Sequence, residues 1–252
     1  MKNNRTVSLI IPAYNEEVNI QKGVLDKISN FTKEHAEFSE IIIVDDGSTD
    51  NTKDLVKRDY MKRFSHFRLI ENNHAGKAQA IMTGIKEAKS DVVMFTDIDL
   101  ATPIEEGEKL LNALKDTYDI AIGSRNTHRE GAPLLRKIMA VGFIFIRNSL
   151  IGLNNIKDTQ CGFKVFDRKI ALKIIDKLQV FKTQASITGS SVKAGFDLEF
   201  LFVAIKLGYK IKEIPVTWKH VETKNVNFLR DFIDTMKDIL AIKYYDLTKK
   251  YD

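Results

Sequence analysis

The chain has 252 residues, of which 44% are hydrophobic and 29% are charged, close to the average for soluble globular proteins, so global disorder is excluded. Its one cysteine excludes a disulfide framework and a cysteine-based zinc site within a single chain. The net charge of +5 arises from 39 basic and 34 acidic residues that are interleaved along the chain. Because no concentrated basic face is indicated, we expect no nucleic-acid partner.

The first half of the sequence alternates short apolar runs with longer amphipathic segments. The runs have the length and β-branched composition of buried strands, and they are Val7–Ile11, Glu40–Val44, Phe67–Ile70, Asp91–Thr96 and Asp119–Ile122. The intervening segments have helical spacing; they begin near Glu16 and Asp50 and then span Lys77–Ala88 and Pro103–Leu114. This alternation predicts an α/β fold with a mostly parallel central sheet and helices on both faces, in which ligands bind outside the carboxyl ends of the strands.

Beyond Gly123 the alternation is looser. The pattern predicts helices over Leu134–Leu150, Lys169–Lys177, Phe196–Leu207 and Phe228–Tyr245, and strands over Phe163–Phe166, Lys210–Ile214 and Val216–Trp218. The last helix places one apolar stripe on a single face, made of Phe228, Leu229, Phe232, Ile233, Met236, Ile239 and Leu240. No linker-like stretch interrupts the chain, so a single domain over residues 1–252 is expected. No apolar run reaches the roughly 20 residues of a bilayer span, so no transmembrane segment is expected.

Two acidic pairs follow predicted strands. Asp45 and Asp46 are adjacent carboxylates that repel each other and need hydrogen-bond donors or a ligand, whereas a helix cap made by Ser48 leaves the pair unexplained. Asp97 and Asp99 are two residues apart and share one side of an extended chain. Paired carboxylates at a strand end form a divalent-cation site that phosphate oxygens and water complete, and plain surface charge is the alternative.

Other strand ends carry an aromatic ring and cations. Pro12 stiffens the first turn, and Tyr14 beside it offers a ring to a nucleobase. Gly76 and Lys77 open a helix, an arrangement that suits phosphate. Arg125 ends the fifth strand, where its fork of donors can bind a phosphate. Each feature alone is more often a turn or a solvated cation, but together they meet the needs of a nucleotide diphosphate with a metal.

In order along nearly the whole chain, these motifs resemble the GT-A glycosyltransferases of family 2, in the branch that transfers sugars from nucleotide sugars to polyprenyl or dolichyl phosphate. The matching segments are Ile11–Glu16, Val44–Asp50, Gly76–Lys77, Asp97–Pro103, Gly123–Arg125, Asp158–Lys164, Gly195–Glu199 and Ile214–Trp218. Within the branch, Leu100–Pro103 and the Trp218 segment are most similar to dolichyl-phosphate β-glucosyltransferases, and mannosyl members are the nearest alternative. Mannosyl members commonly have a polar residue where Ala101 stands here.

The resemblance implies roles for the matching residues. Those that would bind the nucleotide sugar are Pro12, Ala13, Tyr14, Glu16, Asp46, Lys77, Asp97 and Lys224. Those that would bind the acceptor are Arg125, Arg136, Gln160, Asp197 and Glu199. Asp97 and Asp99 would hold Mg²⁺ or Mn²⁺, and Asp99 and Arg125 would be catalytic. Residues 1–125 would form the nucleotide-sugar half, and residues 126–252 the acceptor half with the last helix.

The function implied is inverting transfer of a hexose, in first place glucose from UDP-glucose, onto a polyprenyl or dolichyl phosphate at a membrane surface. The alternatives are mannosyl transfer from GDP-mannose to the same acceptor class and a non-catalytic, membrane-associated protein that binds nucleotide sugars. The expected location is peripheral, on the cytoplasmic face, and a homo-oligomer is left open. The segment Leu134–Leu150 joins an apolar run to Arg136, Lys137 and Arg147, so either it is an amphipathic helix at the bilayer surface or it packs on the sheet.

Overall fold

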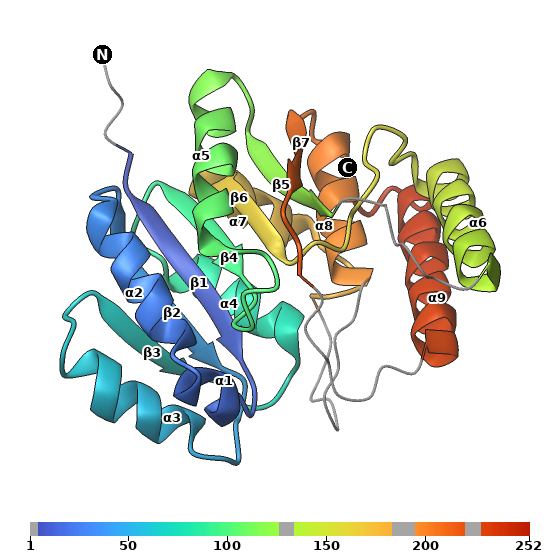
Figure 1. Ribbon diagram of the computed structural model, residues 1–252. Coiled ribbons are helices and arrows are strands. Elements are labelled where there is room, and N and C mark those ends of the chain that lie inside the picture. Colours follow the sequence, from blue (N-terminus) through green and yellow to red (C-terminus); the bar gives the residue numbers. More distant parts are fainter. Residues whose placement is uncertain (1–4, 126–133, 183–194, 220–227) are drawn as a thin grey trace.

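The fold is known from a computed structural model that describes residues 5–125, 134–182, 195–219 and 228–252, without the side chains of residues 116, 134–141 and 228–231. Within these residues seven strands form one sheet in the order β3-β2-β1-β4-β6-β5-β7 (Figure 1). The strands are β1 (Val7–Ala13), β2 (Phe38–Asp45), β3 (Phe67–Glu71), β4 (Val92–Thr96), β5 (Ile120–Arg125), β6 (Phe163–Asp167) and β7 (Ile211–Val216). Only β6 among them runs antiparallel to its neighbours. The expected mostly parallel sheet is confirmed.

Helices cover both faces of this sheet. They are α1 (Glu17–Gln21), α2 (Val24–Glu34), α3 (Thr52–Leu55), α4 (Lys77–Glu87), α5 (Gly107–Asp116), α6 (Leu134–Ile151), α7 (Arg168–Lys177), α8 (Gly195–Lys206) and α9 (Phe228–Leu247). A π-helical turn, η1 (Val56–Met61), continues α3, and a 3₁₀ turn, η2 (Ile104–Glu106), precedes α5. The helix expected near Glu16 is divided into α1 and α2 at Gly23, whose φ of 77° a helix interior does not accept.

Alternate residues of each central strand point into two separate apolar cores. On β1, Ile10 faces the core beneath α4, α7 and α8, whereas Leu9 and Ile11 face the core beneath α2, η1 and α5. All three residues are fully buried. The central strands therefore read as continuous apolar runs, and the carboxyl ends of the parallel strands meet at one edge of the sheet (Figure 1).

The last strand differs from its prediction. A single strand, β7, takes the place of the two expected on either side of Pro215, and it pairs with β5 from Ile120↔Ile211 to Arg125↔Val216. Proline fits within β7 because this strand forms the edge of the sheet, where the missing N–H interrupts no ladder. Trp218 therefore follows the strand.

At the opposite end of the sheet from β3, α6 packs beside α9, with the rings of Phe143 and Phe232 6.3 Å apart (Figure 1). The apolar stripe predicted on α9 is only partly buried, because Ile239 is fully buried whereas Ile233 and Leu240 are 46% and 57% exposed. Phe145 on α6 is 71% exposed. Among the described helices, none has the length and apolar character needed to cross a bilayer.

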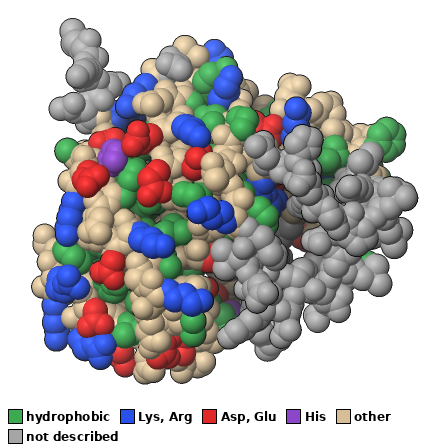
Figure 2. Space-filling view, viewed as in Figure 1, with side chains coloured by type: hydrophobic (Ala, Val, Ile, Leu, Met, Phe, Trp, Pro, Cys, Tyr) green, Lys and Arg blue, Asp and Glu red, His purple; other side chains and the backbone are tan. Residues whose placement is uncertain are grey.

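The membrane prediction required Arg147 to lie at the surface of α6, but this residue is buried. Its side chain is 1% exposed, and it donates hydrogen bonds to the carbonyl oxygens of Leu153 and Ile156 just beyond the helix. Burial lowers the pKa of this guanidinium. The arginine therefore ties the end of α6 to the segment that follows it. Elsewhere, acidic and basic side chains lie side by side over the face of the molecule in Figure 2.

Candidate functional site

The loops that follow β1 and β2 are joined by hydrogen bonds at the carboxyl edge of the sheet. The backbone N–H of Asn15 donates to the Ser48 hydroxyl (2.9 Å), and the Asn15 side-chain oxygen accepts from the Thr49 N–H (2.8 Å). The N–H of Glu16 donates to the Thr52 hydroxyl (2.7 Å). Ser48 thus binds the β1 loop and does not cap a helix as predicted, because α3 begins only at Thr52.

The adjacent carboxylates of Asp45 and Asp46 hold two different loops. Asp45 accepts the N–H groups of Gly47 (3.1 Å) and Ser48 (3.0 Å) in its own turn, and its Oδ1 is buried with no hydrogen-bond partner among the described residues. The Asp46 side chain faces the loop after β3 and is only 3% exposed. The two carboxylates therefore have separate partners, Asp45 in its own turn and Asp46 in the loop after β3.

Asp46 fixes the loop that leads into α4. Its carboxylate accepts the N–H of Ala75 (2.9 Å), the N–H of Gly76 (2.7 Å) and the Nδ1 proton of His74 (2.8 Å). Three donors on one buried carboxylate make this loop rigid. The predicted contact of Asp46 with base or ribose stays a prediction, and the structure shows that the carboxylate also shapes the loop beside it.

An aromatic pair lies next to this loop. The rings of Tyr14 and His74 stack with their centroids 4.2 Å apart and an interplanar angle of 15°. Tyr14 stands where a nucleobase ring was expected to bind, after the half-buried Pro12 and the buried Ala13. The sequence prediction gave His74 no role; its one signal was its position directly before Ala75-Gly76-Lys77.

Asp97 and Asp99 come together in a turn and not, as predicted, in extended chain. Strand β4 ends at Thr96, and the Leu100 N–H bonds back to the Asp97 carbonyl (3.2 Å) while Leu100 adopts a φ of 49°. Oδ1 of Asp99 accepts the Ala101 N–H (3.0 Å). The turn leaves Ile98 in the core and both carboxylates at the sheet edge.

Negative charge accumulates at this turn. Burial raises the pKa of Asp99, and the charge of Asp97 raises it further. Burial also raises the pKa of Glu16, to which the charges of Asp99 and Asp97 contribute. Lys77 at the start of α4 forms an ion pair with Oδ1 of Asp97, and although burial opposes it, the charge of Asp97 keeps the pKa of Lys77 raised. A cation is therefore already drawn to this position.

The two aspartates suit a divalent cation that a ligand completes. Among the described residues, no group of three His, Cys, Asp or Glu side chains is arranged to hold a metal by itself. Mg²⁺ and Mn²⁺ favour carboxylate oxygens, and Mg²⁺ sites often combine one or two protein carboxylates with phosphate oxygens and water. Asp97 and Asp99 supply those two carboxylates, and a cation beside them would offset both the burial of Asp99 and its repulsion from Asp97, which together raise the pKa of Asp99.

Arg125 lies at the end of β5 in a two-point ion pair. Its Nε and Nη2 donate to Oδ2 (2.7 Å) and Oδ1 (2.8 Å) of Asp158, and its backbone N–H also donates to Oδ2 (3.0 Å). The guanidinium carbon is 5.9 Å from the Trp218 ring centroid, within the range of a cation–π contact. Asp158 belongs to one of the segments that match the family, but no role was predicted for it.

A small cavity of about 50 Å³ connects the two groups of residues. Its lining includes Asp97, Arg125, Gln160, Gly162 and Trp218. Gly162 is required there, since a Cβ would overlap the Asp97 carboxylate. The backbone of Gln160 is fixed by a bond from its N–H to Asp158 (3.1 Å), and its side chain is exposed. The structure therefore places a carboxylate and a guanidinium on one cavity.

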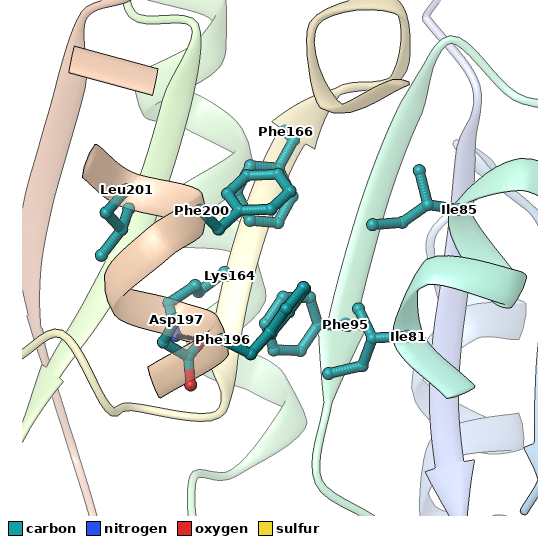
Figure 3. Close-up of a pocket in the computed structure, with 9 residues that line it drawn as sticks. All are labelled: Ile81, Ile85, Phe95, Lys164, Phe166, Phe196, Asp197, Phe200 and Leu201. Atoms are coloured by element: carbon teal, nitrogen blue, oxygen red, sulfur yellow. Dashed lines mark hydrogen bonds and ion pairs between the residues drawn. The ribbon is translucent and has the colours of Figure 1, made fainter. Parts of the chain in front are cut away.

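Asp197 lies behind this cavity in a buried ion pair. Lys164 of β6 and Asp197 of α8 point toward each other in Figure 3, with Nζ 2.7 Å from Oδ1. Nζ also donates to the Cys161 carbonyl (2.5 Å) and lies 5.3 Å from the Phe95 ring centroid. The surrounding apolar side chains of Figure 3 leave no room for a ligand. Asp197, with its side chain 20% exposed, is the part of this pair that remains near solvent.

The prediction that Glu199 binds the acceptor is wrong. Its side chain is fully buried, and its carboxylate accepts the N–H groups of Gln179, Val180 and Phe181 and the hydroxyl of Tyr251. Four hydrogen bonds within the chain explain the carboxylate as an internal anchor between α7, α8 and the last residues. The side chains of Arg136 and Lys224, also predicted site residues, lie outside the described residues.

Comparison with known proteins agrees with this geometry. Residues 8–175 match glycosyl transferase family 2. The dolichyl-phosphate beta-glucosyltransferase of Saccharomyces cerevisiae is 34% identical over 94% of this chain and 74% of its own length, and that of Homo sapiens is 30% identical over 97% and 76%. Glucosyl-3-phosphoglycerate synthase of Mycobacterium tuberculosis, solved with Mn²⁺, UDP and glucosyl-3-phosphoglycerate, has a TM-score of 0.65 at 18% identity over 95% of this chain and 80% of its own. The expected GT-A fold is confirmed.

Proposed function

Because the chain belongs to glycosyl transferase family 2, we propose that it transfers glucose from UDP-glucose to dolichyl phosphate or a closely related polyprenyl phosphate. The observation that carries the proposal is the single cavity bordered by Asp97 and by Arg125. A transferred sugar must lie between a leaving phosphate and an accepting phosphate, and these two side chains suit the two ends of that path. The names of the relatives favour glucose over mannose, the alternative sugar.

On the donor side, formed by Tyr14, Asp46, Lys77, Asp97 and Asp99, the nucleotide would extend along the strand ends. The base would meet the Tyr14 ring, beside the loop that Asp46 holds. The diphosphate would meet Lys77 at the amino end of α4, where helix N–H groups and the ammonium both favour an anion. Lys77 would then exchange its contact with Asp97 for one with phosphate. Lys224 is assigned to the same phosphates by family resemblance alone.

Asp97 and Asp99 would hold Mg²⁺ or Mn²⁺. When bound, this ion supplies charge neutralisation for the departing nucleoside diphosphate. The contribution of the chain is to hold two carboxylates at one turn through the backbone bonds of Leu100 and Ala101, so that little reorganisation is needed.

On the acceptor side, formed by Arg125, Asp158, Gln160, Asp197 and Trp218, the task is to bring a second anion to the sugar. A lipid monophosphate carries its charge near neutral pH, since its second pKa is about 6, so no strong base is needed to activate it. Arg125, with Arg136 and Gln160, would bind this phosphate and offset its repulsion from the donor.

The reaction proposed is one direct displacement. An oxygen of the acceptor phosphate forms a bond to the anomeric carbon as the bond from that carbon to the β-phosphate oxygen of UDP-glucose breaks. UDP leaves with the electron pair, the anomeric configuration inverts, and no sugar is attached to the enzyme. Trapping a sugar on any carboxylate of the chain would contradict this step.

The acceptor's lipid chain requires a membrane surface, and α6 offers one apolar contact. Phe145 is 71% exposed and Ile144 is 36% exposed, while Phe143 contacts Phe232 instead. We expect Phe145→Ser to weaken binding to phosphatidylcholine–phosphatidylserine vesicles roughly 10-fold, as measured by sedimentation. Val18→Ser, at a 56% exposed position on α1, is the matched control. Equal binding of both variants would show that α6 does not meet lipid.

The cheapest test of the function is nucleotide release. Purified protein is incubated with Mg²⁺, farnesyl phosphate and either UDP-glucose or GDP-mannose, and the released diphosphate is measured with and without the lipid. Lipid-dependent UDP release supports the proposal, and lipid-dependent GDP release alone would transfer it to mannose. Binding of UDP-glucose without release would favour the non-catalytic alternative, and release with simple sugars as acceptors would point to a soluble acceptor.

Two further expectations go with this function. We expect a single domain in which residues 1–125 bind the nucleotide sugar and residues 126–252, together with Arg125, bind the acceptor. Location on the cytoplasmic face and assembly into a homo-oligomer stay predictions.

A further inference from the structure

The geometry points to Asp158 as a positioning residue that sets which edge of the Arg125 guanidinium faces the reaction cavity. The inference rests on the proposed function, in which Arg125 binds the acceptor phosphate. Asp158 lies in the segment before β6, and its hydrogen bonds among the described residues join it to Arg125, Gln160 and Glu213. Its side chain is 12% exposed, and the described lining of the cavity includes Arg125 but not Asp158.

The guanidinium has two edges that can form paired hydrogen bonds. Asp158 takes the edge made by Nε and Nη2, with bonds of 2.7 and 2.8 Å. A planar guanidinium held along one edge has its remaining donors fixed in direction, on Nη1 and on the second hydrogen of Nη2. The Trp218 ring, 5.9 Å from the guanidinium carbon, limits tilting of the plane. The guanidinium of Arg125 is therefore already oriented before an acceptor binds.

Asp158 is itself held firmly. The N–H groups of Asp158 (2.7 Å) and Lys157 (3.1 Å) donate to the carboxylate of Glu213 on β7. Two residues before Asp158, the carbonyl of Ile156 accepts a hydrogen bond (2.5 Å) from the buried Arg147 of α6. Burial by itself raises the pKa of Asp158, but the hydrogen bonds and charge of Arg125 outweigh burial and hold that pKa below its usual range. The carboxylate thus stays charged and in place.

Without Asp158 the arginine has another carboxylate to turn to. The charge of Asp197 already acts on Arg125, and Asp97 lines the same cavity. A guanidinium that pairs with either one no longer presents its free edge to a phosphate. Loss of Asp158 should therefore weaken acceptor binding and leave donor binding intact.

The test measures steady-state UDP release at varied farnesyl phosphate and at varied UDP-glucose. For Asp158→Asn we expect the acceptor KM to rise about 10-fold or more, because a charge-assisted pair is lost, while the donor KM changes by less than about 2-fold. Asp158→Glu, which keeps the charge, should recover part of the loss. Asp119→Asn is the matched control, since Asp119 bonds the Lys210 N–H at the other end of β5.

A double-mutant cycle separates positioning from general stability. Lysine lacks a fork, so Arg125→Lys should raise the acceptor KM by itself, and Asp158→Asn added to it should have little further effect. Independent, multiplicative effects would overturn the inference, as would an unchanged acceptor KM in Asp158→Asn. Trp218 is the one tryptophan of the chain, so its fluorescence adds a binding readout that needs no turnover and shows whether each variant is folded.

Failure of the proposed function has a different signature. If the unchanged protein releases no UDP in response to the lipid, the proposed acceptor is wrong. If it does release UDP and Asp158→Asn keeps a normal acceptor KM, only the role of Asp158 is wrong. Should Asp158→Asn fail to fold, the same cycle built from Asp158→Glu, Arg125→Lys and the variant that combines these two still decides the question.

Discussion

The donor side and the acceptor side of the cavity hold their charged groups in different ways. On the donor side, Asp45, Asp46 and Asp99 are bound by backbone N–H groups of turns and loops. On the acceptor side, Arg125 and Lys164 are held by carboxylates that lie 33 residues away in each case. Neutral N–H donors fix the position of a carboxylate and leave its charge uncompensated, whereas an ion pair compensates the charge of the group that it positions.

This difference bears on catalysis. Asp97 and Asp99 keep a net negative charge at one turn. In the proposed function this charge would attract a metal ion, and that ion would offset the charge of the diphosphate. Asp158 offsets part of the charge of Arg125, so in the proposed function Arg125 would hold a phosphate and still release a product. Donor binding would then depend on local loop geometry, and acceptor binding on how distant segments pack together.

The largest effect should come from removing the charge held at the donor-side turn. Asp97→Asn and Asp99→Asn should each lower turnover by about 10²-fold or more, because charge on the leaving group is no longer offset. Lipid-dependent UDP release measures the loss, and thermal melting should show an intact fold. Glu105→Gln, at an exposed position after the same turn, is the control. Near-normal turnover in both variants would show that the donor side does not depend on this pair.

A smaller effect should follow from freeing the loop after β3. Asp46→Ala leaves the N–H groups of Ala75 and Gly76 without their acceptor, so UDP should bind roughly 10- to 100-fold more weakly. Isothermal titration with UDP measures the change. Asp26→Ala, which removes the acceptor of the Tyr60 hydroxyl at a distant place, is the comparison. Equal losses in the two variants would mean that the effect is one of stability and not of the loop.

A variant of Lys77 tests whether the ion pair between Lys77 and Asp97 must break when the donor binds. Lys77→Gln removes the cation that contacts Asp97, so Mn²⁺ alone should bind several-fold more tightly and UDP several-fold more weakly, each a change of about 1 kcal/mol. Metal binding is followed by the electron paramagnetic resonance of free Mn²⁺. Lys86→Gln removes the same charge from an exposed position of α4. If both variants bind Mn²⁺ alike, the ion pair has no special part.

The smallest effect concerns stability away from the site. A hydrogen bond to the Phe31 carbonyl raises the pKa of His35, and Glu108 adds to the shift. The protonated ring therefore stabilises the fold at low pH, and this contribution, below about 1 kcal/mol, is lost as pH rises through the raised pKa. His35→Gln should remove that loss between about pH 5 and pH 8 in urea unfolding. Burial lowers the pKa of His66, so the contribution of this ring to stability increases as pH rises. His66→Gln should therefore remove an increase in stability and not a loss.

Much of the donor side could be predicted because its residues follow strands within a few positions. The turn at Asp97–Asp99 is a partial exception. Sequence placed both carboxylates at the strand end, but it assumed extended chain because nothing marks Leu100 for a φ of 49°. The stacking of His74 on Tyr14 was also missed, since the two rings come from loops 60 residues apart that only the sheet brings together.

The acceptor side was predicted less completely for the same physical reason. Arg125 was found by its place at a strand end, but its partner Asp158 is set by the antiparallel insertion of β6, which no local pattern encodes. Glu199 was assigned wrongly because the local sequence around an acidic residue near a helix start is the same whether that residue faces solvent or a buried turn. Only packing shows that three N–H groups and Tyr251 surround it.

The direction of β6 has a consequence for how such a protein diversifies. Thr96 pairs with Phe163, so the beginning of β6, and not its end, lies beside the place where Asp97 leaves the sheet. The connection between β5 and β6 therefore ends beside the Asp97 turn, and it supplies Asp158 and Gln160 of the proposed acceptor side. In the proposed function, changes in that one connection would alter which molecule receives the sugar, while the strands that precede it stay the same.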